Sequence, residues 1–416
     1  MKHGDDDSAT TSTPTASSRA GGRQGNVRRV LESLRLHGPS SQAALARRTE
    51  LSRATVNNIV KSLREEGIAE TRPVNGREFL VALVSRQGAV MSVQVNVTSL
   101  RASLFDFGTH ARHDASVTFQ EDTEEEGGDP ELVVDMVHTL VSRAGLLSTD
   151  LAGVAVAVQA PLARATGTVT SWARLQLPAW RDIPVAESLQ ETLGVPVWAE
   201  NDANLAALAE WTWGSGQGAA DFLYAMCSAK VGGGLVIDGR IYRGGDGLAG
   251  EIGHMVLEPE GPVCFCGSRG CLTTFVSERS LLHALKSSGG GHTTLHQVID
   301  SARRGDPACR RVLYEAGRHL GRAFANTAKL MAPSVVAVGG TLSKAGPLLF
   351  DSLVSSAEVQ SLKVASPDIR FVPASLGDDA ALLGGVAMVF AETGTGASAL
   401  PAWALRQQTV QKPNSR

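Results

Sequence analysis

Three of the chain's five cysteines stand close together just after a histidine, and this cluster constrains the fold more than any other feature. His254 is followed by Cys264, Cys266 and Cys271. One imidazole and three thiolates form a closed set of four ligands suited to structural zinc. The alternative is a group of buried free cysteines beside a histidine, but clustered Cys-x-Cys plus Cys is typical of a metal site. We therefore predict one Zn²⁺ bound by these four side chains.

The length of the chain predicts more than one domain. At 416 residues it is too long for one ordinary core, and its 43% apolar content supports globular folding. No apolar run is long enough to span a membrane, and residues 1–20 lack the apolar core of a signal peptide. Together with cysteines suited to metal rather than disulfides, this predicts a cytoplasmic protein without a membrane segment.

Charge is distributed unevenly along the chain, although the net charge is only −3. Between residues 19 and 90, basic residues outnumber acidic ones by about two to one, and the remainder is acidic. A basic N-terminal part on an acidic body indicates a module that binds a polyanion. Ordinary surface variation would give a similar imbalance, so charge alone does not decide.

Residues 25–84 predict a winged helix-turn-helix, preceded by a disordered polar tail at residues 1–24. A first helix has one apolar face, a second starts at Ser41, and a third follows Ser52, a good N-cap residue. Two strands flank Asn75-Gly76, a strong hairpin turn. A helical module for protein contacts is the alternative, but the basic balance and the wing favour DNA.

The start of the third helix of such a module meets base edges in the major groove. The wing lies near phosphate or the minor groove. The predicted DNA contacts are therefore Ser52, Arg53, Thr55, Asn57 and Asn58 on the helix, with Arg72 and Arg77 on the wing.

Beyond a short linker, the pattern of strands and helices predicts two α/β lobes. The first spans residues 89–201 and the second residues 202–393. The last helix, starting near Asp379, is expected to pack back on the first lobe. Residues 394–416 are expected to form a loose tail.

The zinc segment also resembles a known family. Gly250-Glu-Ile-Gly-His254, followed by Cys264-x-Cys-Gly-x-x-Gly-Cys271, is similar to the signature of the ROK family of sugar-responsive repressors, open reading frames and sugar kinases. The resemblance covers about residues 89–393 and implies a two-lobed, actin-like ATPase fold around a cleft. Winged modules precede this domain in ROK repressors and are absent from ROK kinases.

The resemblance implies four ligand contacts: Asn201, Asp202, Glu251 and His254. Asp202 matches the carboxylate that accepts the hydroxyl proton in the kinases, and without the resemblance it could simply cap a helix. His254 would use one ring nitrogen for zinc and the other for a sugar hydroxyl, so the metal would fix its tautomer.

The phosphate side departs from the family pattern. ROK kinases carry Asp-x-Gly-Gly-Thr where this chain has Gln94-Val-Asn-Val-Thr98, and Gly-Thr-Gly where it has Ser228-Ala-Lys230. We therefore expect neither ATP binding nor phosphoryl transfer. Sugar-side positions differ too, at Gln176 and Thr273, and Lys230 either pairs with an anionic ligand or lies on the surface.

The sequence thus favours a ROK-type transcriptional regulator, with repression expected, that binds operator DNA and a sugar or sugar-derived effector. Helix-turn-helix proteins usually read paired half-sites as dimers, so a homodimer or homotetramer is expected. A sugar kinase with an added DNA-binding head is the second hypothesis. A metal-stabilised interaction protein without a ligand is the third.

Overall fold

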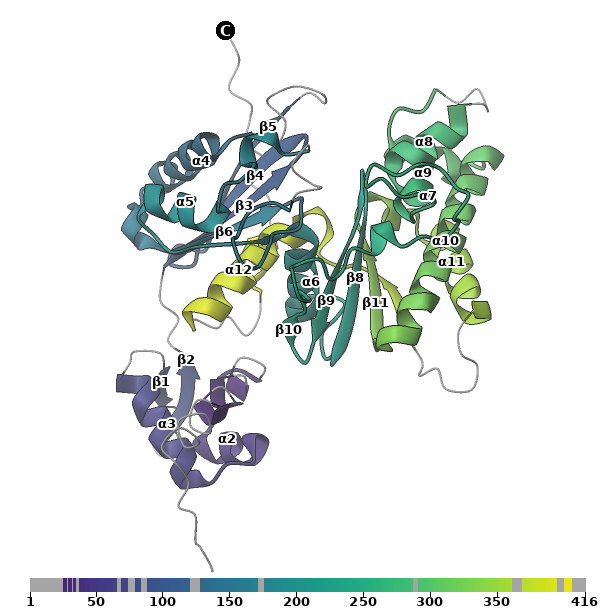
Figure 1. The fold of residues 1–416 in the computed structure, drawn as a ribbon. Helices are drawn as coiled ribbons and strands as arrows, with labels where there is room; N and C mark the ends of the chain where they lie inside the picture. The colour runs from purple at the N-terminus through teal and green to yellow at the C-terminus, as the bar shows by residue number, and fades with distance from the viewer. Residues whose placement is uncertain are drawn as a thin grey trace, which may run out of the picture. The chain divides into compact units, whose positions relative to one another are not determined.

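The computed structural model describes residues 25–27, 29–31, 33–34, 37–65, 69–73, 79–83, 88–119, 128–170, 176–286, 291–360, 369–394 and 400–405. The chain divides into two units, which are described separately. One holds residues 1–86 with 390–399, and the other holds residues 87–389 with 400–416 (Figure 1).

The N-terminal unit is a winged helix-turn-helix. The described residues between 25 and 37 are helical, and α2 (Gln42–Thr49) and α3 (Arg53–Glu65) follow. Ser41 Oγ accepts from the Ala44 N–H, and Ser52 Oγ accepts from the Thr55 N–H at 3.1 Å, so each helix starts at a side-chain cap. The apolar faces of the helices bury a small core around Val30, Leu45, Val56, Val60 and Leu63.

The wing is an antiparallel pair, β1 (Ala69–Pro73) and β2 (Phe79–Leu83). Val81 exchanges two backbone hydrogen bonds with Ser40, which fastens the wing to the chain before α2. The predicted turn at Asn75-Gly76, together with Arg77 and the side chain of Arg72, lies outside the described residues.

The first lobe of the larger unit is built on a five-stranded sheet of order β5-β4-β3-β6-β7. Its strands are β3 (Ala89–Asn96), β4 (Ser99–Asp106), β5 (Ala111–Thr118), β6 (Leu151–Val158) and β7 (Val197–Asn201). The first three are antiparallel, and β3, β6 and β7 run parallel. Helices α4 (Pro130–Arg143) and α5 (Val185–Leu193) cover one face (Figure 1).

The second lobe repeats this topology. Its sheet has the order β10-β9-β8-β11-β12, with an antiparallel meander joined to parallel strands. The strands are β8 (Asp221–Cys227), β9 (Val231–Ile237), β10 (Arg240–Ile241), β11 (Val335–Gly339) and β12 (Arg370–Pro373). The helices on its outer side are α7 (Thr273–Val276), α8 (Glu278–Leu285), α9 (Leu295–Arg303), α10 (Pro307–Met331) and α11 (Pro347–Gln360). The predicted pair of α/β lobes is confirmed.

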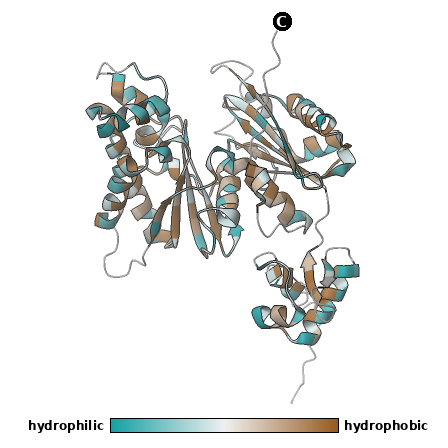
Figure 2. Cartoon of the chain, turned by 180° about the vertical axis from the view of Figure 1, so that it is seen from behind, coloured by the Kyte–Doolittle hydropathy of each residue, from teal (hydrophilic) through white to brown (hydrophobic). Residues whose placement is uncertain are grey.

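Two helices, α6 (Asp202–Trp213) and α12 (Ala380–Thr393), connect the lobes. Gly384 of α12 lies so close to the Leu205 carbonyl of α6 that a Cβ there would stand 1.9 Å from its oxygen. Gly385 lies equally close to Ser92 of β3, so α12 returns the chain to the first lobe. Figure 2 shows how apolar α12 is. Within the described residues, no helix combines the length and apolar content needed to cross a bilayer.

The expectation of a loose tail at residues 394–416 is wrong for residues 400–405. These residues include a short 3₁₀ helix, Ala402–Leu405, whose Ala404 is buried. The buried Arg112 guanidinium donates to the Ala404 carbonyl at 3.0 Å, and the Trp403 ring meets Phe107 edge-on at 5.2 Å. A buried guanidinium group needs several hydrogen-bond acceptors, and residues 400–405 supply one of them through the Ala404 carbonyl.

Candidate metal centre and neighbouring polar site

The zinc segment is folded by its own backbone. His254 ends a short 3₁₀ turn, and the Cys264 N–H donates to the Ser268 carbonyl at 2.8 Å, which closes a tight loop between the cysteines. Gly270 has φ +62°, and a Cβ there would lie 1.5 Å from the Glu258 carbonyl oxygen. Only glycine fits this position, and it lets the chain turn back so that Cys271 faces Cys266.

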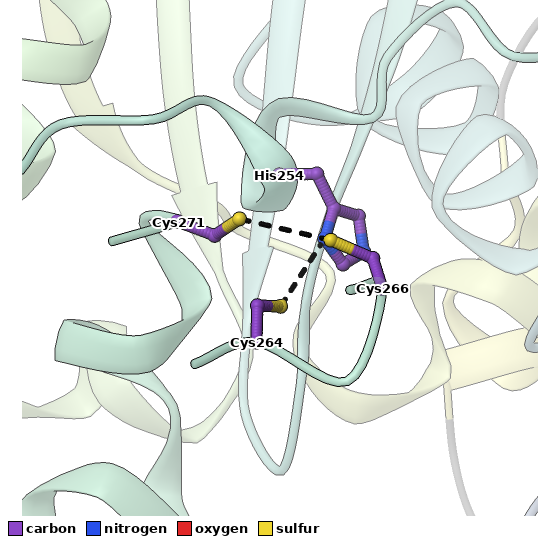
Figure 3. Close-up of side chains that lie close together, drawn as sticks. All are labelled: His254, Cys264, Cys266 and Cys271. Carbon is purple, nitrogen blue, oxygen red and sulfur yellow. Dashed lines mark hydrogen bonds between the residues drawn. The ribbon is translucent and has the colours of Figure 1, made fainter. Parts of the chain in front are cut away.

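The four predicted metal ligands converge (Figure 3). Their ligand atoms all lie within 4.8 Å of one another. Cys266 Sγ is 3.8 Å from Cys271 Sγ, and His254 Nδ1 is 3.6 Å from Cys264 Sγ. In tetrahedral zinc, bonds of about 2.3 Å to sulfur and 2.0–2.1 Å to nitrogen place two sulfurs roughly 3.8 Å apart, and nitrogen and sulfur roughly 3.6 Å apart. The measured separations fit zinc.

Protons must leave before the metal can bind. Burial, together with hydrogen bonds from the other thiols, raises the pKa of Cys271 to about 12. Only thiolates bind zinc, so metal binding releases protons and weakens as the pH falls. Cys264 and Cys271 are buried, whereas Cys266 is exposed at the surface of the loop.

Three of the four predicted ligand contacts form a polar cluster beside the metal centre. Because Nδ1 of His254 faces the cysteines, Nε2 faces Glu251, 4.0 Å from Oε2. Burial raises the pKa of Asp202 to about 7, and burial together with the charge of Asp202 raises that of Glu251 to about 7. Both carboxyl groups can therefore donate or accept a proton near neutral pH.

Asn201 differs in role from the other three. Its Oδ1 accepts from the backbone N–H groups of Ala203 and Asn204, at 3.0 and 3.1 Å, so it is the N-cap of α6. Asp202 is the first residue of the helix and not its cap. The helix cap that the sequence suggested at Asp202 is therefore the preceding residue, Asn201.

Sequence reasoning missed an ion pair beside this cluster. Glu200 is buried, accepts from Asn204 Nδ2 at 2.9 Å, and pairs with Arg243 Nε at 2.5 Å. Arg243 lies in the second lobe and Glu200 ends the first, so the pair spans the two. A glutamate at the end of an apolar strand implies a cationic partner, but nothing in the sequence identifies which.

The turns that correspond to the phosphate loops use their polar groups internally. The Val97 N–H donates to Gln159 Oε1 at 3.1 Å, and the Thr341 N–H donates to Ser228 Oγ at 2.9 Å. The Arg101 guanidinium is paired with Asp379 at 2.5 Å and lies 3.4 Å from Gln94 Oε1.

Four of the predicted DNA contacts, Arg53, Thr55, Asn57 and Asn58, lie in the first turns of α3. Arg53, Asn57 and Asn58 are exposed, while the opposite face packs into the core. Ser52 and Thr55 hydrogen-bond each other at 2.8 Å, which commits Ser52 to the helix start.

A surface hollow of about 200 Å³ lies in the second lobe, lined by Glu258, Glu315, Arg318, His319 and Arg322. It involves none of the predicted ligand residues. It is also smaller than typical ligand pockets of about 300–1,000 Å³.

Two family models match the sequence. The ROK family model matches residues 90–392, well over half of the chain, and a winged helix-turn-helix DNA-binding model matches residues 24–70. The chain belongs to the ROK family.

Similar proteins include ROK repressors and kinases. A xylose repressor from Caldicellulosiruptor bescii is 26% identical over 375 residues, covering 85% of this chain and 92% of the repressor. A glucokinase from Halalkalibacterium halodurans is 33% identical over 268 residues, covering 61% of this chain and 80% of the kinase. A crystal structure of a ROK family transcriptional regulator, described as a homologue of Escherichia coli MLC, has a TM-score of 0.76 at 23% identity. It covers 90% of this chain and 97% of that one, and it shows that the fold is shared.

The extent of these matches separates the two kinds of ROK protein. The repressor alignment covers 85% of the chain, which is more than the ROK domain at residues 90–392 contains. The glucokinase alignment covers 61%, which is less than that domain. The chain is thus similar to ROK repressors beyond the domain that repressors and kinases share.

Proposed function

We propose that this ROK protein is a DNA-binding transcriptional regulator, most simply a repressor, controlled by a carbohydrate-type effector. The observation that carries the proposal is the exposed start of α3, where Arg53, Asn57 and Asn58 face solvent while the apolar residues of the helix pack into the core. Asparagine can pair with adenine, and arginine with guanine or phosphate. We place the DNA-binding domain at residues 25–84 and the effector-binding lobes at residues 89–201 and 202–393.

The polar cluster supports a polyhydroxyl effector. The Asp202 carboxyl group is buried, the Glu251 carboxyl group is half-buried, and His254 Nε2 faces Glu251. A hydroxyl group can accept from Nε2 and donate to a carboxylate, so neighbouring hydroxyls of a sugar suit this pair of side chains. The interlobe pair of Arg243 and Glu200 adjoins Asn201, so a ligand in the cluster can favour one lobe arrangement over another.

Zinc is proposed as a structural metal. His254, Cys264, Cys266 and Cys271 would hold it, and the ion would crosslink the turn at His254 to the cysteine loop. With Nδ1 on the metal, the His254 proton stays on Nε2, where it can meet a hydroxyl group. The metal would thereby stabilise the fold and orient one ligand contact.

Phosphoryl transfer is not part of the proposed function. Phosphate loops need free backbone amides. Here the amide of Val97 donates to the Gln159 side chain and that of Ser228 to the Lys230 carbonyl, and Gln94 replaces an acidic residue. The kinase alternative keeps one favourable observation, since Asp202 has a pKa of about 7, suitable for a general base.

We propose a homodimer or homotetramer, since paired half-sites require two helix-turn-helix units. Light scattering of the purified protein measures this directly, and a monomer at micromolar concentration would contradict it.

DNA selected from a random-sequence pool tests the regulator proposal. We expect the full chain to enrich a palindromic or paired sequence, and a chain starting at residue 85 to retain none of this binding. The proposal would be refuted if the full chain recovered DNA without any sequence preference. It would also be refuted if the shortened chain bound the selected DNA as tightly as the full chain does.

A further inference from the structure

Lys230 occupies an unusual position beside the polar cluster. It ends the turn between β8 and β9, where ROK kinases carry glycine. Its Nζ donates to Gln176 Oε1 at 2.5 Å, and Gln176 belongs to the first lobe. The contact therefore joins the two lobes through two residues at which this chain departs from the family pattern.

The ammonium group of Lys230 faces the cluster and the metal loop. The residue is half-buried, and its Nζ lies 5.9 Å from the centre of the Phe265 ring. Its charge opposes the effect of burial on Asp202, which raises the pKa of that carboxyl group, so the ammonium lies within electrostatic reach of the cluster. Lys230 is thus the cation of the proposed effector site.

The backbone around Lys230 offers an incoming anion little else. The Ser228 N–H donates to the Lys230 carbonyl at 3.0 Å, and the Ser228 hydroxyl accepts from Thr341. Asp202 and Glu251 suit hydroxyl groups and would repel an anion. A negatively charged group must therefore be bound on the Lys230 side of the cluster.

We propose that Lys230 determines effector specificity by selecting a sugar that carries an anionic substituent, either a phosphate or a carboxylate. This inference rests on the proposed function and names the ligand class of the same site. Gln176 offers the ammonium a neutral oxygen, whereas an anion offers an oppositely charged one and so forms an ion pair in a partly desolvated place. The anion would compete with Gln176 for Lys230, so binding would break an interlobe contact and change the lobe arrangement.

Binding measurements with matched sugars test the inference. The full-length, zinc-loaded protein is titrated by calorimetry with glucose, glucose 6-phosphate, glucuronate and inorganic phosphate. We expect one of the two anionic sugars to bind at least roughly tenfold more tightly than glucose. Lys230→Met should reduce that preference by roughly 10- to 100-fold, the range for a hydrogen bond to a charged group, and should leave glucose binding unchanged.

Two further variants guard against a structural effect. Lys230→Arg keeps the charge and should keep most of the preference. Lys329→Met removes an exposed lysine on α10 and should change nothing. The titrations also distinguish the two anionic substituents. A site for phosphate binds glucose 6-phosphate more tightly, and a site for a carboxylate binds glucuronate more tightly.

The inference is overturned if glucose binds as tightly as both anionic sugars, if neither anionic sugar binds, or if Lys230→Met lowers the affinity for all sugars equally. Binding to selected DNA is measured on the same samples. If the protein binds selected DNA normally but gives one of these three results, only the inference about Lys230 is refuted. If the protein does not bind DNA, the regulator proposal itself is refuted.

Discussion

His254 connects two kinds of chemistry through one ring. Nδ1 lies among the cysteines and Nε2 faces Glu251, so loss of the metal would affect both the fold and the polar cluster. We predict that Cys264→Ser abolishes zinc binding and destabilises the protein by several kcal/mol, because structural zinc contributes directly to folding. Elemental analysis and thermal melting measure the two effects.

Cys309→Ala provides the control for this prediction. Cys309 is buried like Cys264 but lies outside the metal cluster. The Cys309→Ala variant should lower the free energy of unfolding only through lost packing, and it should still bind one zinc per chain. If Cys264→Ser retains both its metal and its melting temperature, the assignment of the site is wrong.

Asp202 gives stability a pH dependence of known sign. Burial raises the pKa of Asp202 from 3.8 to about 7 in the folded protein. The protonated side chain therefore contributes fully to the free energy of unfolding below pH 3.8, and this contribution is lost as the pH rises through about 7. Asp202→Asn removes the buried charge. We predict that its stability relative to wild type increases by on the order of 1–2 kcal/mol between pH 5.5 and pH 8.

Urea unfolding at the two pH values measures this difference. Asp351→Asn, an exposed change on α11, is the control and should show no trend. A relative stability of Asp202→Asn that falls with rising pH would show that the carboxylate is stabilised by partners and not strained by burial.

Single residues were predictable where local chemistry decides their role. The four residues of the candidate metal cluster are close in sequence, so their spacing was sufficient to predict that they converge. Arg243 and Gln159 were not predictable, because their partners Glu200 and Val97 are 43 and 62 residues away and only the fold brings them together. Capping was considered only for Asp202, and the structure gives this role to Asn201, since either side chain suits a helix start.

Helix α3 is the element on which the DNA prediction depends. We predict that Asn57→Ala or Asn58→Ala weakens the preference for selected DNA by roughly 1–3 kcal/mol per lost bidentate base contact. Arg77→Ala, on the wing, should instead weaken binding to all sequences alike and flatten the salt dependence.

Gel-shift titrations against selected and random DNA at two salt concentrations separate these effects. Lys61, exposed on α3 and paired with Glu65 at 3.9 Å, offers a charge control on the same helix. An unchanged preference in both asparagine variants would exclude α3 as the element that reads bases.

Elements with strong local patterns matched their prediction closely. Ser41 and Ser52 were expected at helix starts, and both cap helices. The segment after the metal cluster forms two helices, α7 and α8, separated at Ser277, which caps the second of them. A serine inside an apolar pattern gives no clear sign of whether it will interrupt a helix or continue it.

The whole molecule should not phosphorylate sugars. Both turns that correspond to phosphate loops bond to the protein itself, through Gln159 and Ser228. We predict no turnover in a coupled assay with ATP, magnesium and a panel of hexoses. A rate of about 1 s⁻¹ or more, the lower range for kinases, would establish the enzyme instead.

The family resemblance implied a two-lobed, actin-like fold, but the repeated strand order of the two lobes was not predicted. Periodicity predicted most strands, but it cannot order them in a sheet, because pairing depends on contacts between distant segments. The packing of residues 400–405 on the first lobe was missed for the same reason, since polar and small residues around them suggested a tail.

The hydrogen bond from Arg112 to Ala404 joins residues 292 positions apart. Asp379 pairs with the same guanidinium, so a side chain near the start of the first lobe takes its partners from the last part of the chain. The core of the winged module is formed by residues between Val30 and Val81, so it can form early during synthesis. Arg112 of the first lobe meets its last partners only after almost the entire chain has been translated, and the lobe stays incomplete until then.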